Sequence, residues 1–297
     1  MASNNNTSGV TLNKKKFHVS KVFIYIALAF WALTTIYPFF WVILNSFRES
    51  TMIVRDSFSI PWPGSGGTFS NYTTAFERVP LLGSYFNSIM ISGIVTIVVV
   101  LLSGFAAYGL VRYQFKGRGF LHSMVIASMM FPAFATIIPV FMMESSWHIV
   151  NTGNTLLSWL SVILPQIAGN LSFSIIVLMG FIRSLPIDLE EAAYLEGYNV
   201  YQIFFKIIFP LAKPSFATVS IFTFLWSYND MFTQMFFLRS RPQYTITRLL
   251  SEIASIAGID YGLMAAAVTV IIVPVLIVYI IFQNNIVKGL TAGAVKG

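Results

Sequence analysis

Six long apolar runs dominate this 297-residue chain and constrain its fold more than any other feature. A helix needs about 20 mainly apolar residues to cross the hydrocarbon core of a bilayer. Runs of that length occupy residues 22–44, 85–111, 120–143, 156–182, 211–238 and 262–282. The pattern predicts an all-α integral membrane protein with six transmembrane helices.

The composition supports this class and excludes several kinds of site. Hydrophobic residues make up 56% of the chain and charged residues only 10%, whereas soluble domains carry about 25% charge. The absence of cysteine excludes disulfides, thiolate metal sites and a cysteine nucleophile. His18, His122 and His148 are scattered without ligand spacing, so we expect no metal site and no catalytic residues.

The distribution of basic residues predicts how the chain is oriented. Six spans place both termini on one side, and twelve of the eighteen Lys and Arg residues then fall on that side. Basic residues are retained on the cytoplasmic side of a membrane, so we expect both termini to be cytoplasmic. The net charge of +7 is explained in the same way, without a nucleic acid partner.

The division of the chain follows from these runs. Residues 1–20 are polar and rich in Asn and Lys, which predicts a disordered cytoplasmic tail. Residues 21–285 form the six-span domain, and residues 286–297 form a second cytoplasmic tail. Two long loops, 45–84 and 239–261, are expected to face outward.

A polar segment between the fourth and fifth runs has the features of a helix, a turn and a second helix. Pro186 suits the first turn of a helix, and Asp188, Glu190 and Glu191 place negative charge at its positive end. Gly197 permits a positive φ after that helix. Asn199, with Gln202 three residues later, reads as the cap of a second helix that runs to Pro210.

The first of these helices has an unusually small face. Leu189, Ala192, Ala193 and Glu196 fall at helical spacing, so another surface can approach the backbone closely. A docking surface and an ordinary polar connection explain this pattern equally well on physical grounds alone.

The spacing of the whole segment resembles a known loop. Glu191-Ala192-Ala193, Gly197 and Ile207-Ile208-Phe209-Pro210 resemble the EAA loop (184–209) of permease subunits of binding-protein-dependent ABC importers, with Phe209 in place of the usual Leu. Residues 107–119, 226–230 and 283–297 are similar to segments of the carbohydrate branch, in particular its maltose-type second permease subunits. The resemblance covers nearly the whole chain from the first run onward. It implies the MetI-like permease fold, with a cytoplasmic coupling helix between helices four and five.

The resemblance also implies which residues dock on an ATPase, with Glu191 as a polar anchor. The implied docking residues are Glu190, Glu191, Ala192, Ala193, Gly197, Ile207 and Pro210. A phosphate-binding loop of the form G-x-x-x-x-G-K-[ST] does not occur in the sequence. We therefore expect this chain to bind no cofactor, and ATP and Mg to be bound by a separate ATPase chain.

The expected partners are an ABC ATPase dimer, a second homologous permease, an extracytoplasmic solute-binding protein and membrane lipid. The implied function is ATP-driven import of a carbohydrate, in particular an oligosaccharide, across a bacterial cytoplasmic membrane. Import of a non-sugar solute by the same machinery is the first alternative. The second alternative is an ion-coupled carrier or a membrane-embedded enzyme. A carrier has thin support because Asp230 is the one plausible intramembrane carboxylate, and an enzyme is disfavoured because the sequence shows no cluster of His or acidic residues at one membrane depth.

Polar side chains within the spans are candidates for the solute path. Amides, hydroxyls and aromatic rings are the groups that recognise neutral sugars. The candidates are Gln166, Asn170, Trp226, Tyr228 and Asn229. The alternative is that these residues form hydrogen bonds to neighbouring helices, a common use of such side chains in membranes.

Overall fold

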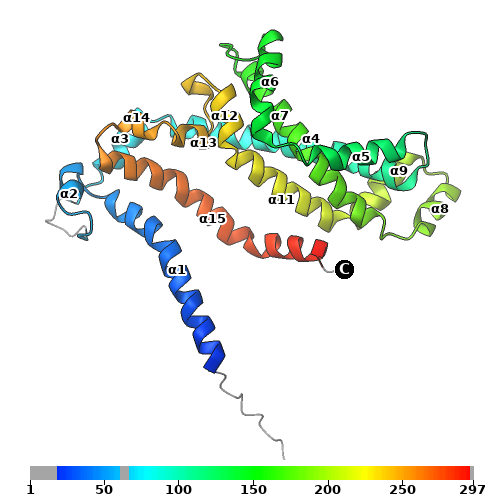
Figure 1. Cartoon of the computed structure of the whole chain (residues 1–297), viewed down its shortest axis with the longest axis horizontal. Coiled ribbons are helices and arrows are strands. Elements are labelled where there is room, and N and C mark those ends of the chain that lie inside the picture. The colour runs from blue at the N-terminus through cyan, green and yellow to red at the C-terminus, as the bar shows by residue number, and fades with distance from the viewer. Residues whose placement is uncertain (1–18, 61–66, 295–297) are drawn as a thin grey trace, which may run out of the picture.

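A computed structural model describes residues 19–60 and 67–294, and within this part of the chain the secondary structure is helical (Figure 1). An isolated β-bridge joins Arg48 to Gly67. The helices are α1 Val19–Asn45, α2 Ser50–Arg55, α3 Ser70–Arg78, α4 Leu81–Arg112, α5 Arg118–Ser128, α6 Ala133–Ser146, α7 Thr155–Ile182, α8 Asp188–Leu195, α9 Val200–Ile203, α10 Phe209–Leu211, α11 Lys213–Asn229, α12 Met231–Phe237, α13 Ile246–Leu250, α14 Ile253–Ala257 and α15 Tyr261–Ala294. A π-helical turn, Phe204–Ile208, joins α9 to α10, and a 3₁₀ turn, Arg241–Gln243, precedes α13. The all-helical prediction is confirmed for the described residues.

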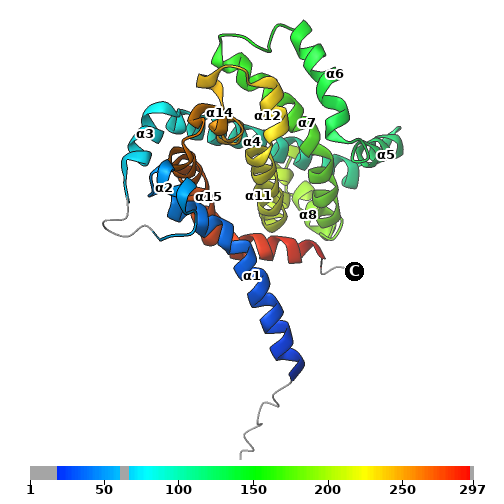
Figure 2. The same cartoon turned by 60° about the vertical axis from the view of Figure 1, so that its left-hand side comes forward.

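Helices α4, α7 and α11 pack together at the centre of the molecule (Figures 1 and 2). Their contacts depend on small side chains, which let helix backbones approach closely within a membrane. A Cβ added at Gly104 of α4 would lie 2.9 Å from Cε1 of Phe216 and 3.1 Å from Cζ of Phe204. Gly104 therefore sets how closely α4 can approach α11.

The first helix contacts the rest of the chain near its C-terminal end, mainly through α15, and is otherwise exposed. Within the apolar segment Lys21–Asn45, no residue of the most apolar 18-residue stretch is buried. Figure 2 shows α1 projecting away from the other helices, which it meets only near its C-terminal end. An apolar surface of this size must be shielded from water, and either lipid or another membrane subunit can bury it.

The third apolar run is not the single helix that hydropathy predicted. Residues 120–143 divide into α5 and α6, which are separated by a break at residues 129–132. Pro132 adopts an extended conformation at this break, and the residue before a proline disfavours the helical region. Figure 2 shows α6 turned away from the direction of α5.

The fifth run also differs from a continuous helix. It forms α11 and α12, which are separated at Asp230. The preceding segment, Val200–Leu211, is bent by 82° relative to α11. Within the described residues, three helices are individually long and apolar enough to cross a membrane, or four if this bent pair forms one span. The count of six spans therefore stays a prediction.

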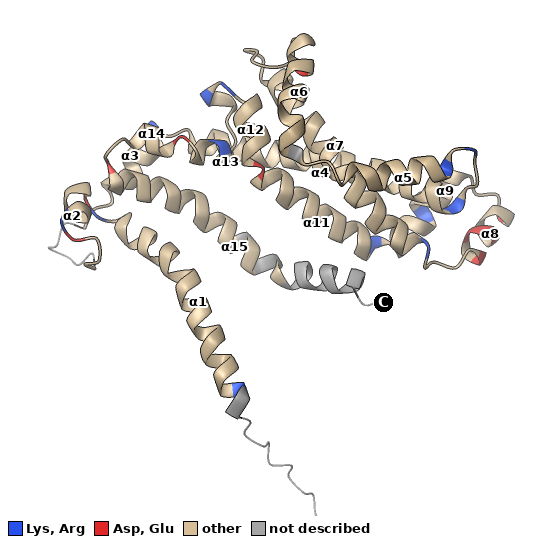
Figure 3. Cartoon of the chain, viewed as in Figure 1, with Lys and Arg blue, Asp and Glu red and all other residues tan. Residues whose placement is uncertain are grey.

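Connections predicted to share a side do lie at one end of the molecule. The segment between α4 and α5 and the segment containing α8 and α9 lie together, and Figure 3 shows Lys and Arg around them and Asp and Glu on α8. Helices α2, α3, α13 and α14 lie at the opposite end (Figure 1).

The two predicted tails fall largely at the limits of the described structure. Of residues 1–20, only Val19 and Ser20 are described, and they begin α1. Residues 286–294 continue α15, while residues 295–297 lie outside the described part of the chain.

Candidate functional site

The segment after α7 forms the predicted helix, turn and helix. Helix α8 begins two residues after Pro186 and carries three acidic residues in its first turn. It ends in a Schellman motif, in which the amide of Gly197 donates to the carbonyl of Tyr194 and that of Tyr198 donates to Ala193, each over 3.0 Å. Gly197 has φ +82°. The role predicted for this glycine in the turn is therefore confirmed.

The second helix begins with the predicted cap. The Asn199 side chain accepts from the amide of Gln202, and the Gln202 side chain accepts in return from the amide of Asn199, each over 2.9 Å. The helix then passes through a π-helical turn, in which the amide of Phe209 donates to the carbonyl of Phe204 five residues earlier. Pro210 has no N–H to donate to the carbonyl four residues before it, which accounts for this wider turn.

Glu190 attaches α8 to the end of α4. Its Oε1 atom lies 2.5 Å from Nε of Arg112, and its Oε2 atom accepts a 2.8 Å hydrogen bond from the hydroxyl of Tyr108. Only 4% of Glu190 is exposed. Arg112 also donates from Nη2 to the carbonyl of Leu185 over 2.9 Å. A buried carboxylate paired in this way fixes the position of α8 on the molecule.

A second contact joins the same two segments nearer the solvent. The hydroxyls of Tyr113 and Tyr194 lie 2.9 Å apart. The hydrogen bond to Tyr113 raises the pKa of Tyr194 to about 12, so this hydroxyl stays protonated at physiological pH. Residues 107–119 and the segment that resembles the EAA loop (184–209) therefore form one structural unit, although they are separate motifs in the sequence.

The predicted docking residues divide between the interior and the surface. Glu190 and Ala193 are buried within the chain, so they are not accessible to a partner. Glu191, Ala192, Gly197 and Pro210 are exposed, and Ile207 is half-buried. Within the small face predicted for α8, Leu189, Ala192 and Glu196 remain exposed while Ala193 packs inward. The docking role of the exposed residues stays a prediction.

A buried polar network lies between α7, α11 and α12. Gln166 donates from Nε2 to Oδ2 of Asp230 over 3.0 Å, and its Oε1 accepts a 2.6 Å hydrogen bond from Ser227. Gln234 donates to the carbonyl of Ser227, and the hydroxyl of Thr245 donates to Oε1 of Gln234. Gln166 is among the residues predicted from the sequence, whereas Gln234 was not predicted, because only its burial in a contact between helices marks it as part of this network.

Asp230, the one plausible intramembrane carboxylate, has a structural role in this network. Its Oδ1 atom accepts from the amide of Thr233 at the start of α12, over 3.0 Å. The side chain thus caps a helix and binds Gln166, and both contacts account for its presence without an ion pathway.

The remaining predicted path residues lie in different environments. Tyr228 is buried and stacks on Phe224 with ring centroids 5.9 Å apart. Asn170 is buried, and its Oδ1 atom has no hydrogen-bond partner in the described structure. Trp226 and Asn229 are exposed. The structure therefore leaves two of the five candidates, Trp226 and Asn229, free to contact a solute in the conformation observed.

The described residues contain no group of three or more His, Asp or Glu side chains placed to hold a metal ion. The prediction that the chain binds no cofactor is not tested by this observation and stays a prediction.

Curated relatives match over most of their length. The chain is 33% identical to the diacetylchitobiose uptake system permease protein NgcG of Streptomyces coelicolor, over 91% of this chain and 87% of that protein. It is also 33% identical to the arabinooligosaccharides transport system permease protein AraQ of Halalkalibacterium halodurans, over 92% of this chain and 95% of that protein.

A solved structure shows a similar fold. A bacterial ABC transporter involved in the import of the acidic polysaccharide alginate has a chain that superposes with a TM-score of 0.73 at 22% identity, covering 90% of this chain and 98% of that one. This similarity confirms the MetI-like permease fold. Residues 99–292 match the family of binding-protein-dependent transport system inner membrane components, and the chain therefore belongs to that family of ABC importer permeases.

Proposed function

We propose that this chain is a transmembrane subunit of an importer for a carbohydrate, and that the carbohydrate is an oligosaccharide. The cargo assignment is supported by the relatives, whose names refer to diacetylchitobiose, arabinooligosaccharides and trehalose. The exposed Trp226 and Asn229 offer the aromatic face and the amide that a neutral sugar requires. A non-sugar solute remains the alternative cargo of the same machinery.

ATP hydrolysis belongs, in this proposal, to a separate ATPase dimer that binds ATP and Mg and docks on α8. The observation that carries the proposal is the attachment of α8 to α4 through Glu190, Tyr108 and Arg112. Because α4 holds α8 on its inner side, a movement of the ATPase bound to the outer side of α8 can be transmitted to α4 and the other central helices. Leu189, Ala192 and Glu196 form that outer side, and Glu191 is the polar residue next to it.

A second, homologous permease is proposed to complete the solute path. Support comes from α1, whose apolar surface is left uncovered by this chain.

The solute-binding protein is proposed to rest on the end of the molecule formed by α2, α3, α13 and α14. One solved transporter of this fold was determined in complex with an alginate pentasaccharide-bound periplasmic protein. The proposal places this end outside the cell, and it places the α8 end and both termini in the cytoplasm.

Uptake by cells that lack the gene for this chain would test the proposal. The solutes would be a panel of labelled neutral di- and oligosaccharides, with an amino acid and a polyamine as non-sugar comparisons. We expect the deletion to abolish uptake of at least one oligosaccharide, and a plasmid copy to restore it. Uptake that depends on a proton or sodium gradient and survives ATP depletion would overturn the importer assignment. If the deletion abolished uptake of only a non-sugar solute, the assignment of a carbohydrate cargo would be overturned.

A further inference from the structure

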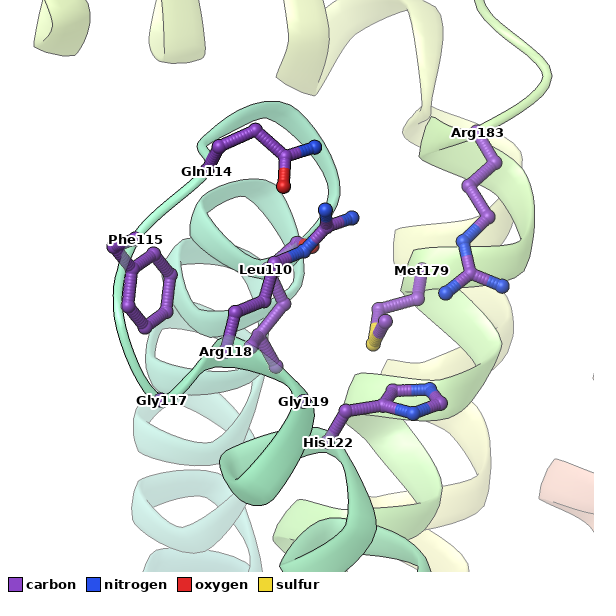
Figure 4. A pocket seen from close by; sticks show the side chains of 9 residues that line it. All are labelled: Leu110, Gln114, Phe115, Gly117, Arg118, Gly119, His122, Met179 and Arg183. Atoms are coloured by element: carbon purple, nitrogen blue, oxygen red, sulfur yellow. The ribbon is translucent and has the colours of Figure 1, made fainter.

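A basic cavity opens between the N-terminal end of α5 and the C-terminal end of α7 (Figure 4). Its volume is about 420 Å³. Three of its lining side chains are basic: Arg118, His122 and Arg183. The lining contains no Asp or Glu. Figure 4 shows Arg118 and His122 on the side of α5 and Arg183 on the opposite wall. This cavity has the charge of a site for an anion.

The two arginines have donors to spare within the described structure. Arg118 uses Nε to donate to the carbonyl of Leu110 over 2.7 Å, which holds its guanidinium at the cavity. The ion pairs of the described residues involve other arginines, namely Arg112, Arg241 and Arg248. The terminal nitrogens of Arg118 and the whole guanidinium of Arg183 therefore have no carboxylate partner in this part of the chain.

A second, apolar cavity adjoins the first along the same helices. Its volume is about 550 Å³, and it shares Leu110 and Phe115 with the basic cavity. Most of its other lining side chains are apolar or small, on α4, α5 and α7, and they include Met124, Ala168 and Ile175. Together the two cavities form one groove with a cationic head and an apolar body.

The length of the groove matches the depth of one membrane leaflet. Arg183 follows the last residue of α7, and Ile175 and Ala168 lie eight and fifteen residues before it. At about 1.5 Å per residue, the apolar body extends about 12 to 22 Å from the arginine along the helix. A bilayer is about 40–45 Å thick with its headgroup regions included, so one leaflet measured from its headgroups is about 20–22 Å deep. An acyl chain whose headgroup lies at the arginine therefore fits this depth.

From this arrangement we propose that the groove between α4, α5 and α7 binds one anionic phospholipid. The phosphodiester headgroup lies between Arg118, His122 and Arg183, and an acyl chain lies along Met124, Ala168 and Ile175. Basic pockets between membrane helices on the cytoplasmic side are suited to anionic headgroups. The site is separate from the proposed docking face of α8, and it does not depend on the cargo or on ATP hydrolysis.

Native mass spectrometry of the full-length chain in mild detergent tests the proposal. The chain is titrated with phosphatidylglycerol, with phosphatidylcholine and with sodium phosphate. We expect one phosphatidylglycerol to bind at least tenfold more tightly than phosphatidylcholine. Equal affinity for the two lipids would overturn the proposal.

Three variants locate the site. The double change Arg118→Gln and Arg183→Gln should weaken phosphatidylglycerol binding about tenfold, whereas Arg55→Gln and Arg78→Gln, which remove two exposed arginines elsewhere, should leave it unchanged. Arg183→Gln alone should weaken binding while the thermal unfolding temperature is retained, because the Arg183 side chain has no ion-pair partner to lose among the described residues. Wild-type affinity for phosphatidylglycerol in the Arg118/Arg183 double variant and in Arg183→Gln would contradict the assignment.

A change in the apolar body distinguishes a lipid from a free anion. Ala168→Trp fills the groove, so it should weaken binding of phosphatidylglycerol and leave phosphate unaffected. If phosphate displaces the lipid completely and Ala168→Trp has no effect, the cavity is a free-anion site and the lipid assignment is wrong.

Discussion

The carboxylate of Glu190 lies 2.5 Å from Nε of Arg112 and 2.8 Å from the hydroxyl of Tyr108. These contacts join residues about 80 positions apart in the sequence, from the end of α4 and the start of α8. The adjacent Glu191 is exposed. Two neighbouring carboxylates in the same helix thus have different environments, which makes them a matched pair for experiment.

Glu190→Ala should loosen α8. Removing one partner of a buried ion pair leaves an uncompensated charge on Arg112 and costs about 3–5 kcal/mol. We expect faster amide hydrogen exchange over residues 184–199 in this variant. Tyr108→Phe removes one hydrogen bond to a charged group, which is worth about 1.5–3 kcal/mol, and should give a smaller change in the same direction.

Glu191→Ala is the control for the pair. It should leave hydrogen exchange over residues 184–199 unchanged, because an exposed carboxylate without a partner contributes little to stability. If this residue is a docking anchor, the variant should bind the ATPase less tightly with its own fold intact. Equal effects of the two changes on hydrogen exchange would contradict the division into an inner and an outer glutamate.

Gly197→Ala should weaken the turn between α8 and α9. A side chain at φ +82° costs about 1–2 kcal/mol, and the added Cβ would meet nothing within 4 Å, so the cost comes from the backbone alone. Gly197→Asn should cost less, because Asn tolerates this conformation. We expect the ratio of solute imported to ATP hydrolysed to fall in the order Gly, Asn, Ala.

Gly83→Ala provides the comparison for that series. Gly83 lies in α4, and its added Cβ also meets nothing within 4 Å, but its φ is not positive. Alanine is favoured over glycine in a helix by about 0.5–1 kcal/mol, so this variant should be as stable as the wild type or more so. Coupling that stays normal in Gly197→Ala would show that the turn does not transmit motion.

Gly104→Ala should strain the crossing of α4 with α11. The new methyl group would lie 2.9 Å from the ring of Phe216, and overpacking of a tight contact costs about 1–3 kcal/mol. We expect a lower thermal unfolding temperature in detergent. Phe216→Leu in the same chain should recover at least half of the loss, and failure to recover would mean that another contact sets the helix separation.

The sequence could predict features that depend on local chemistry. The caps at Gly197 and Asn199 require only residues within one turn of each other, so residue type and spacing were sufficient. Hydropathy alone treats residues 120–143 as one run, because an average over 20 residues does not register a single proline, so the separation of α5 from α6 at Pro132 came from the structure. Glu190 and Glu191 could not be separated, because their difference depends on which side of α8 meets α4. The contact between Gln166 and Asp230 joins two helices 64 residues apart, and no periodicity reports such a pairing.

The polar residues within the spans give the last prediction, which separates packing from solute contact. Gln166→Leu should reduce stability by about 1–3 kcal/mol, because it leaves the half-buried Asp230 without a hydrogen-bond partner at Oδ2 and Ser227 without its acceptor. Thermal unfolding of the purified chain would measure that loss. Asn229→Ala should leave the unfolding temperature unchanged, since its side chain is exposed and donates only to the carbonyl of Leu225.

Transport measurements then show whether Asn229 contacts the solute. If it does, Asn229→Ala should raise the KM for uptake severalfold, because one hydrogen bond to a sugar hydroxyl is worth about 0.5–1.5 kcal/mol. Trp226→Phe, which keeps an aromatic ring against Phe173, should have a smaller effect than Trp226→Ala. An unchanged KM in both Asn229→Ala and Trp226→Ala would show that the solute path lies on other residues. The exposed part of α11 that carries Trp226 and Asn229 would then be a candidate contact surface for the second permease.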